Sequence, residues 1–208
     1  MQERYISTSV IRRLPKYHRC LRELERAGVA KVSSSVLAKT LGFTASQVRQ
    51  DFSCFGGFGQ QGYGYKVSSL LAEIAGIIGI DRVHTAAIIG VGNLGRALMH
   101  NFNFKNCGFE LCAAFDANKQ VIGEKIGDIE VSDIADLERF FKESPFDVAV
   151  LTLPKAYVKD MAKKLSELGV SGIWNFTSVD LSLEELGVAV ENVHFADSLK
   201  TLCYEISK

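Results

Sequence analysis

Three glycines with a fixed spacing are the residues of this sequence best suited to specific binding chemistry. The segment "GVGNLG" places Gly90, Gly92 and Gly95 directly after the apolar run Ala86–Ile89. A glycine turn between a buried strand and a helix lets backbone amides at the helix N-terminus approach a pyrophosphate closely. A single glycine motif is a weak signal, so the elements around it decide whether the turn binds a dinucleotide.

An acidic residue follows the glycines at the distance typical of dinucleotide binding. The second apolar run, "FELCAAF", ends at Asp116, which lies 21 residues after Gly95. A carboxylate there accepts hydrogen bonds from an adenosine ribose and repels a 2′-phosphate, which favours NAD over NADP. Lys119, three residues later, weakens that preference slightly.

Apolar segments continue to alternate with amphipathic ones as far as residue 193. They predict helices over 133–144 and 156–169 and strands over 147–153, 170–178 and 188–193. This alternation is typical of an α/β fold with a Rossmann-type doubly wound parallel sheet, in which ligands bind at the carboxyl ends of the strands. Phe176 follows one such strand and is expected to flank a nicotinamide ring. The predicted cofactor-binding residues are Gly90, Val91, Gly92, Asn93, Leu94, Gly95, Asp116, Thr152, Leu153, Pro154, Asn175, Phe176 and Thr177.

This back half lacks a residue set for catalysis. Hydride transfer needs a positioned acid or base, and His194 is the one histidine expected near a strand end on the nicotinamide side. The Tyr-x-x-x-Lys of short-chain dehydrogenases occurs once, at Tyr204–Lys208, beyond the sheet, and we interpret it as coincidence. We predict no enzyme. Two alternatives stay open: an NAD-dependent oxidoreductase docked by its front half, and a module that binds CoA, which this fold does not exclude.

The zero net charge conceals an asymmetry between the two halves of the chain. Residues 1–82 contain 12 Lys and Arg against 6 Asp and Glu, whereas residues 83–208 contain 12 against 18. A basic front half on a neutral protein predicts a domain that binds a polyanion.

Helix signals in the front half predict a reader of DNA. Helical spacing runs through 16–28, and two shorter helices follow within 32–42 and 43–56, each starting at a capping Ser or Thr. Two short helices joined by a glycine-containing turn form a helix-turn-helix. Gln and Arg near the start of the second helix are suited to pair with adenine and guanine in the major groove.

The segment "GGFGQQGYGYKV", residues 56–67, predicts a β-hairpin with a glycine tip, and a helix follows over 67–78. A hairpin directly after a recognition helix is the wing of a winged-helix domain, in which glycines allow a close approach to the sugar-phosphate chain. The predicted DNA-binding residues are Ser33, Ser34, Ser46, Gln47, Arg49, Gln50, Gln60, Gln61, Tyr63 and Lys66.

These patterns predict a winged-helix DNA-binding domain over 1–80, a Rossmann-type domain over 81–193 and a C-terminal helix over 194–208. The last helix has Phe195, Leu199, Leu202 and Ile206 on one face, which must pack on its own sheet or on a partner subunit.

Five cysteines without metal-ligand spacing predict no metal and mostly buried thiols, with a thiol redox switch as the alternative. No apolar run is long enough for a bilayer and no signal peptide is evident, which predicts a cytoplasmic protein.

With these residues in hand, the whole chain resembles the Rex family of bacterial redox-sensing transcriptional repressors. The matching stretches are "SSSVLAKTLGFTASQVRQDFSCFGGFGQQGYGY", "GVGNLGRAL", "VLTLP" and "GIWNF". The resemblance implies a homodimer that binds a palindromic operator in double-stranded DNA, with NADH and NAD⁺ competing for the glycine-rich site. It implies that NADH releases the operator and that the controlled genes serve anaerobic reoxidation of NADH. It also implies a C-terminal helix swapped between subunits.

The resemblance further implies a polar switch near the nicotinamide. Its arginine falls on Arg19. Its carboxylate falls on Asp197, although an ungapped alignment places His194 at that position. A tyrosine that the family often has is replaced by Asn101, so we expect discrimination between NADH and NAD⁺ to depend mainly on Arg19. The operator sequence, the target genes and the affinity ratio of the two nucleotides stay open.

Overall fold

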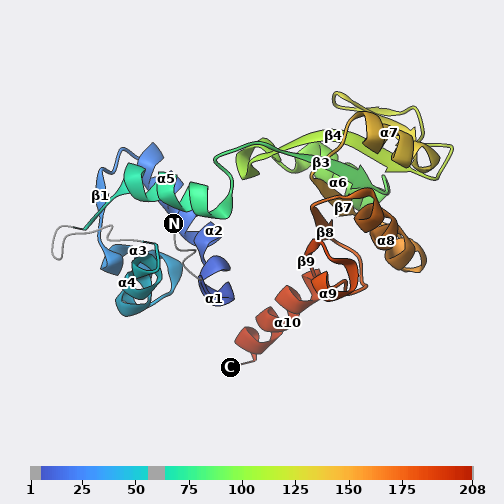
Figure 1. The fold of residues 1–208 in the computed structure, drawn as a ribbon. Coiled ribbons are helices and arrows are strands. Elements are labelled where there is room, and N and C mark those ends of the chain that lie inside the picture. Colours follow the sequence, from blue (N-terminus) through green and yellow to red (C-terminus); the bar gives the residue numbers. More distant parts are fainter. Residues whose placement is uncertain (1–5, 56–63, 208) are drawn as a thin grey trace. The chain divides into compact units, whose positions relative to one another are not determined.

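The structure, a computed structural model, describes residues 6–55 and 64–207. The chain divides into two compact units, Met1–Arg82 and Val83–Lys208, which are described separately below. Figure 1 shows a helical first unit and a second unit built on a sheet.

Helices and one short strand pair make up unit 1. The core is formed by α2, α3, α4 and α5, which bury Leu14, Tyr17, Leu37, Phe52 and Leu70. The elements are α1 (Thr8–Ile11), α2 (Leu14–Arg26), β1 (Lys31–Val32), α3 (Ser34–Leu41), α4 (Ala45–Ser53), β2 (Tyr65–Lys66) and α5 (Val67–Ile78).

Local capping fixes the helix-turn-helix of α3 and α4. Ser33 Oγ accepts a hydrogen bond from Val36 N at 3.2 Å, and Thr44 Oγ1 accepts one from Gln47 N at 3.1 Å. Between the two helices Gly42 adopts φ +72°, a left-handed conformation that glycine takes at little cost. The predicted caps and the predicted turn are therefore confirmed.

Only one end of the predicted wing lies in the described part of the chain. There, β2 pairs antiparallel with β1, with Val32 opposite Tyr65. A Cβ on Gly64, which has φ +70°, would lie 2.8 Å from Val32 O, so this position requires glycine. Residues 56–63, and with them Gln60, Gln61 and Tyr63, lie outside the described residues.

Unit 2 contains a seven-stranded sheet in the order β5-β6-β4-β3-β7-β8-β9. Six of the strands are parallel and β5 pairs antiparallel with β6. The chain runs outward in one direction from β3 and then in the other from β7, which is the arrangement of a doubly wound sheet. The strands are β3 (His84–Ile89), β4 (Phe109–Asp116), β5 (Lys125–Ile126), β6 (Ile129–Asp133), β7 (Val148–Leu151), β8 (Gly172–Asn175) and β9 (Ala189–Asn192).

Helices cover both faces of this sheet. On β3, Ala87 and Ile89 join the core under α7 and α8, while Ala86 and Ile88 join the core under α6. This alternation follows from the two-residue period of a strand. The helices are α6 (Asn93–Asn101), α7 (Leu137–Glu143), α8 (Val158–Leu168), α9 (Leu183–Leu186) and α10 (Phe195–Ile206), with short 3-10 turns at Lys105–Cys107, Ile134–Asp136 and Lys155–Tyr157.

Two sequence-based expectations differ from the structure. The hairpin of β5 and β6 precedes α7 where the sequence predicted only a helix from residue 133, because strands of two and five residues are too short to show a clear alternation. The thiols are not mostly buried: of the five free cysteines only Cys20 is buried. Among the residues that the structure describes, no helix is long and apolar enough to cross a membrane.

Candidate functional site

The glycine turn connects β3 to α6 and depends on tight backbone contacts. Gly90 has φ +100°, and a Cβ there would lie 2.9 Å from Thr152 O. A Cβ on Gly95 would lie 2.2 Å from Gly90 O, so α6 packs against the turn only with glycine at this position. A Cβ on Gly92, which precedes α6, would meet no protein atom within 4 Å. That open position leaves the amides of the α6 N-terminus accessible to a ligand.

Side chains from two neighbouring strands hold this turn in place. Asp116, at the end of β4, accepts a hydrogen bond from Val91 N at 2.6 Å through Oδ2 and one from Asn118 N at 2.7 Å through Oδ1. Thr152, after β7, donates from Oγ1 to Gly90 O at 2.6 Å. The turn is therefore fixed at the point where β3, β4 and β7 end side by side.

A cavity of about 830 Å³ opens at this point. Its volume is in the range of cavities that hold small molecules and cofactors, and it lies at the switch point of the sheet, where doubly wound folds bind their ligands. Eight of the thirteen predicted cofactor residues line it: Gly90, Val91, Gly92, Asn93, Asp116, Thr152, Leu153 and Pro154. Leu94, Gly95, Asn175, Phe176 and Thr177 are not among its lining residues.

Several lining residues were missed by sequence reasoning. Arg96 lies on the first turn of α6 and immediately follows the glycine motif, a position that would have signalled it. Asn118 and Val121 follow Asp116, Tyr157 directly precedes α8 and Met161 lies on α8, and none of these positions carries a ligand signal in the sequence.

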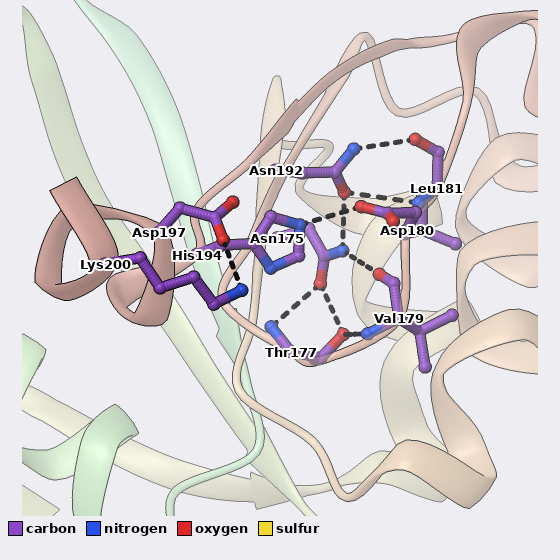
Figure 2. Close-up of polar contacts among 9 residues, drawn as sticks. All are labelled: Asn175, Thr177, Val179, Asp180, Leu181, Asn192, His194, Asp197 and Lys200. Carbon is purple, nitrogen blue, oxygen red and sulfur yellow. Dashed lines mark hydrogen bonds and ion pairs between the residues drawn. The ribbon is translucent and has the colours of Figure 1, made fainter. Parts of the chain in front are cut away.

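Asn175 is fully buried at the end of β8, and its side-chain amide is saturated (Figure 2). Its Nδ2 donates to Val179 O at 2.6 Å and to Asn192 Oδ1 at 2.7 Å. Its Oδ1 accepts from Thr177 N at 3.0 Å and from Thr177 Oγ1 at 2.7 Å. The side chains of Asn175 and Thr177 were expected to face a ligand, but they are used inside the fold, because a buried amide needs partners for all its polar atoms.

The same network anchors the segment that leads into α10 (Figure 2). Asn192, the last residue of β9, accepts from Leu181 N at 3.2 Å and donates to Leu181 O at 2.8 Å. His194 Nε2 lies 2.7 Å from Asp180 Oδ1. The start of α10 is thereby tied to the loop that follows β8.

The predicted switch residues lie in two units. Within unit 2, His194 is paired with Asp180, Asp197 is paired with Lys200 at 3.2 Å on α10 itself, and Asn101 ends α6 with its side chain exposed. In unit 1, Arg19 is exposed on α2. Phe176 packs toward α10, with its ring centroid 6.0 Å from that of Phe195.

The helix-turn-helix of unit 1 presents the second candidate site. Ser46, Arg49 and Gln50 on α4 are exposed, as is Lys66 on β2. Arg49 donates from Nη1 to Ser34 Oγ at 3.3 Å across the two helices. Gln47 differs from expectation: it is half-buried and donates from Nε2 to Asp51 Oδ1 at 2.8 Å, which turns its amide toward this buried carboxylate.

Asp51 is a fully buried carboxylate that no sequence pattern indicated. Besides Gln47, it accepts hydrogen bonds from Arg13 Nε at 2.7 Å and Nη2 at 2.8 Å and from Tyr17 Oη at 2.8 Å. Burial raises the pKa of Asp51, but the hydrogen bonds from Arg13, Gln47 and Tyr17 outweigh it, so the net pKa is lowered. This network fixes α4 to α2.

Segments of both units match models of known protein families. A family model described as "Putative DNA-binding protein N-terminus" matches residues 5–53, and one described as "CoA binding domain" matches residues 81–179. The chain is 47% identical over 203 residues to the redox-sensing transcriptional repressor Rex of Clostridium beijerinckii, covering 98% of this chain and 96% of that protein. For the repressor of the same name from Clostridioides difficile the identity is 48%, with coverage of 96% and 94%.

Two solved structures are similar to this chain over nearly its whole length. The crystal structure of RSP, a Rex-family repressor, in complex with β-NAD⁺ and operator DNA matches with a TM-score of 0.90 and 44% identity, covering 97% of this chain and 93% of that one. The structure of RSP in complex with β-NADH matches with a TM-score of 0.88 and 41% identity, covering 97% and 94%.

Proposed function

Since this chain belongs to the Rex family of redox-sensing transcriptional repressors, we propose that NADH bound at the glycine turn of unit 2 releases unit 1 from a palindromic operator. The chain is an NADH-sensing, DNA-binding repressor and a regulator rather than an enzyme. It binds NADH and NAD⁺. The controlled genes are those of anaerobic NADH reoxidation, and the protein works in the cytoplasm, where the operator lies.

The cavity at the switch point supports a specific placement of the nucleotide. The pyrophosphate lies on the amides at the N-terminus of α6, and Asp116 accepts hydrogen bonds from the hydroxyl groups of the adenosine ribose. The nicotinamide extends past Thr152 toward the end of β8, where Phe176 flanks it. The Rossmann-type domain that holds it spans residues 81–193, between the DNA-binding domain at 1–80 and the helix at 194–208.

The occupant of the nicotinamide end decides the response. NADH and NAD⁺ differ by one hydride and one ring charge, so the contacts that distinguish them surround that ring. A ligand shifts a conformational equilibrium only by its difference in affinity for the two states. Coupling is reciprocal, so operator binding weakens NADH binding by the same factor. Arg19 together with His194 or Asp197 is the proposed switch.

Binding of the nucleotide can be followed with the intrinsic fluorescence of the protein. Trp174 is the single tryptophan and lies on β8 next to Phe176. We expect NADH to quench the emission of Trp174 by energy transfer to its nicotinamide and NAD⁺ to reverse the effect by competition. A titration in which NADH leaves the emission of Trp174 unchanged would contradict this placement, and so would quenching by NADH that NAD⁺ does not reverse.

The exposed side chains of α4 carry the reading of the operator. Ser46, Arg49 and Gln50 contact bases, and Lys66 contacts a phosphate on the wing side. We expect Arg49→Gln to weaken operator binding about 10-fold to 100-fold, which corresponds to the loss of one bidentate base contact. Lys66→Gln should weaken binding to all sequences and lower the salt slope of log K by about one. Fluorescence anisotropy at several salt concentrations measures both.

The matched control for Arg49 is Arg139→Gln, which removes an exposed arginine from α7 of unit 2. It should leave operator affinity unchanged. If Arg49→Gln binds the operator as tightly as the Arg139→Gln control does, α4 is not the helix that reads bases.

The apolar face of α10 supports a homodimer. Phe195, Leu199, Leu202 and Ile206 are 62%, 63%, 55% and 76% exposed, and such a continuous apolar face on a helix needs a cover. We propose that it packs on a second copy of the chain, since two-fold symmetry matches a palindromic operator.

The double substitution Leu199→Glu and Leu202→Glu tests this assembly. We expect sedimentation velocity to show a monomer and operator affinity to fall more than 100-fold, because two half-sites are then no longer bound together. Lys200→Gln, on the same helix, is the control and should remain a dimer. A double variant that sediments as a dimer at low micromolar concentration would contradict the proposal.

CoA is the second candidate ligand, because the family model that matches residues 81–179 is described as a CoA-binding domain. Asp116 beside the proposed ribose site opposes it, since CoA carries a phosphate on that ribose. Competition of CoA against bound NADH decides between the two.

A further inference from the structure

The guanidinium of Arg96 lies beside the proposed adenosine site but is already occupied by another residue. Arg96 lines the cavity together with Asp116 and Asn118. Both of its terminal nitrogens are paired with the carboxylate of Glu124: Nη1 with Oε1, and Nη2 with Oε2 at 2.6 Å. Such a bidentate ion pair fixes the orientation of the guanidinium group and compensates its charge. Glu124 is not among the residues that line the cavity, so the arginine is held from outside it.

The backbone of Glu124 is fixed, which gives the pair a rigid base. Glu124 N donates to Val121 O at 3.1 Å, and Glu124 O accepts from Val131 N at 2.9 Å in the hairpin beside β4. The hydrogen bond from Arg96 lowers the pKa of Glu124, so this carboxylate is ionised at neutral pH. The side chains of Arg96 and Glu124 are 29% and 42% exposed, so the pair lies at the rim of the cavity.

The charges at this end of the cavity decide which adenosine ligands fit. Within this cluster Asp116 and Glu124 carry negative charges and Arg96 carries a positive one, while Lys119 is exposed and is not among the lining residues. An enzyme or sensor that accepts a 2′-phosphate on the adenosine ribose offers it an arginine, because the guanidinium fork matches phosphate oxygens. In this chain Arg96 lies at the end of the cavity that holds Asp116, but both of its terminal nitrogens are already hydrogen-bonded to Glu124.

We infer that Glu124 is a specificity-determining residue, which withholds Arg96 from phosphorylated riboses and so excludes NADP(H). The inference rests on the proposed function, because it assumes that the adenosine half of a dinucleotide lies beside Asp116. It adds a second element to the exclusion that Asp116 provides. It also predicts that a single uncharged substitution, without any new basic residue, opens the site to NADPH.

The test is Glu124→Gln, which keeps the shape of the side chain and removes its charge. We expect the affinity for NADPH to rise at least 10-fold, while the affinity for NADH changes less than 3-fold. Adenosine 2′,5′-bisphosphate and 5′-AMP, which differ only in the 2′-phosphate, should show the same contrast as competitors of NADH. The double variant Arg96→Gln with Glu124→Gln should lose the whole gain, because the gain depends on the freed guanidinium.

Glu138→Gln is the matched control, since Glu138 pairs with Lys164 at 2.9 Å and is not among the residues that line the cavity. It should leave both affinities unchanged. A Glu124→Gln protein that binds NADH normally and NADPH no better than the unaltered protein would overturn the inference alone. An unaltered protein that binds neither NADH nor NAD⁺ would overturn the proposed function and this inference with it.

Discussion

Alanine at Gly92 is expected to lower the affinity for NADH about 100-fold or more without destabilising the protein. A Cβ at this position meets no protein atom within 4 Å, and its φ of −73° suits any residue. The methyl group therefore costs nothing in the free protein but covers backbone that the pyrophosphate must approach. Tryptophan quenching by NADH and thermal unfolding measure the two effects separately. The operator should still bind, and NADH should no longer release it.

Two other alanine substitutions serve as comparisons for Gly92→Ala. Gly95→Ala should lose both NADH affinity and thermal stability, because its Cβ would lie 2.2 Å from Gly90 O and α6 must move. Gly76→Ala, in α5 of unit 1, should change neither NADH affinity nor stability by much, since its nearest contact is Asp81 Oδ2 at 3.8 Å. If Gly92→Ala binds NADH like the Gly76 control, the pyrophosphate does not lie at the start of α6.

Asp51→Ala is expected to lower the free energy of unfolding by about 3–5 kcal/mol. The substitution leaves the guanidinium of Arg13 and the hydroxyl of Tyr17 without the carboxylate that both contact in the interior of unit 1. Since small domains are stable by only about 5–15 kcal/mol, this loss is a large fraction of the total free energy of unfolding. Urea denaturation followed by circular dichroism measures the change.

The effect of Asp51 should depend on pH in one direction. The pKa of Asp51 is lower in the folded protein than in the unfolded chain, so its contribution is complete above the unfolded value of about 4. The contribution is lost as the pH falls through the lower, folded value. The stability difference between the unaltered protein and Asp51→Ala should therefore narrow below about pH 4. Asp136→Ala, which breaks an exposed pair with Arg139, should cost under about 1 kcal/mol at any pH.

Local signals explain why much of this fold is predictable from the sequence. Ser33, Gly42 and Thr44 act on neighbouring backbone, so their roles as caps and turn are visible in a short window of sequence. The helix Val67–Ile78 was predicted with the bounds that the structure shows, because an apolar period ends in Gly79 with φ +76°. The glycine turn and Asp116 were found by the same kind of spacing.

Features that depend on distant contacts were not predictable. Asp51 reads as a solvated acid on a helix, and only its proximity to Arg13 and Tyr17, more than 30 residues earlier, shows that it is structural. The side chains of Asn175 and Thr177 lie at a strand end, as expected, yet they bond to each other and to the chain around them. The pair of Arg96 and Glu124 joins a helix to a turn 28 residues later.

Release of operator DNA by NADH is the central claim, and fluorescence anisotropy of a labelled palindromic operator tests it most directly. The protein is held at one salt concentration, because phosphate contacts make affinity steeply salt-dependent, and NADH, NAD⁺ and CoA are added in turn. We predict that NADH alone lowers the anisotropy to that of free DNA and that NAD⁺ opposes it. Anisotropy that stays high with every nucleotide, or that falls equally with CoA, would contradict the account.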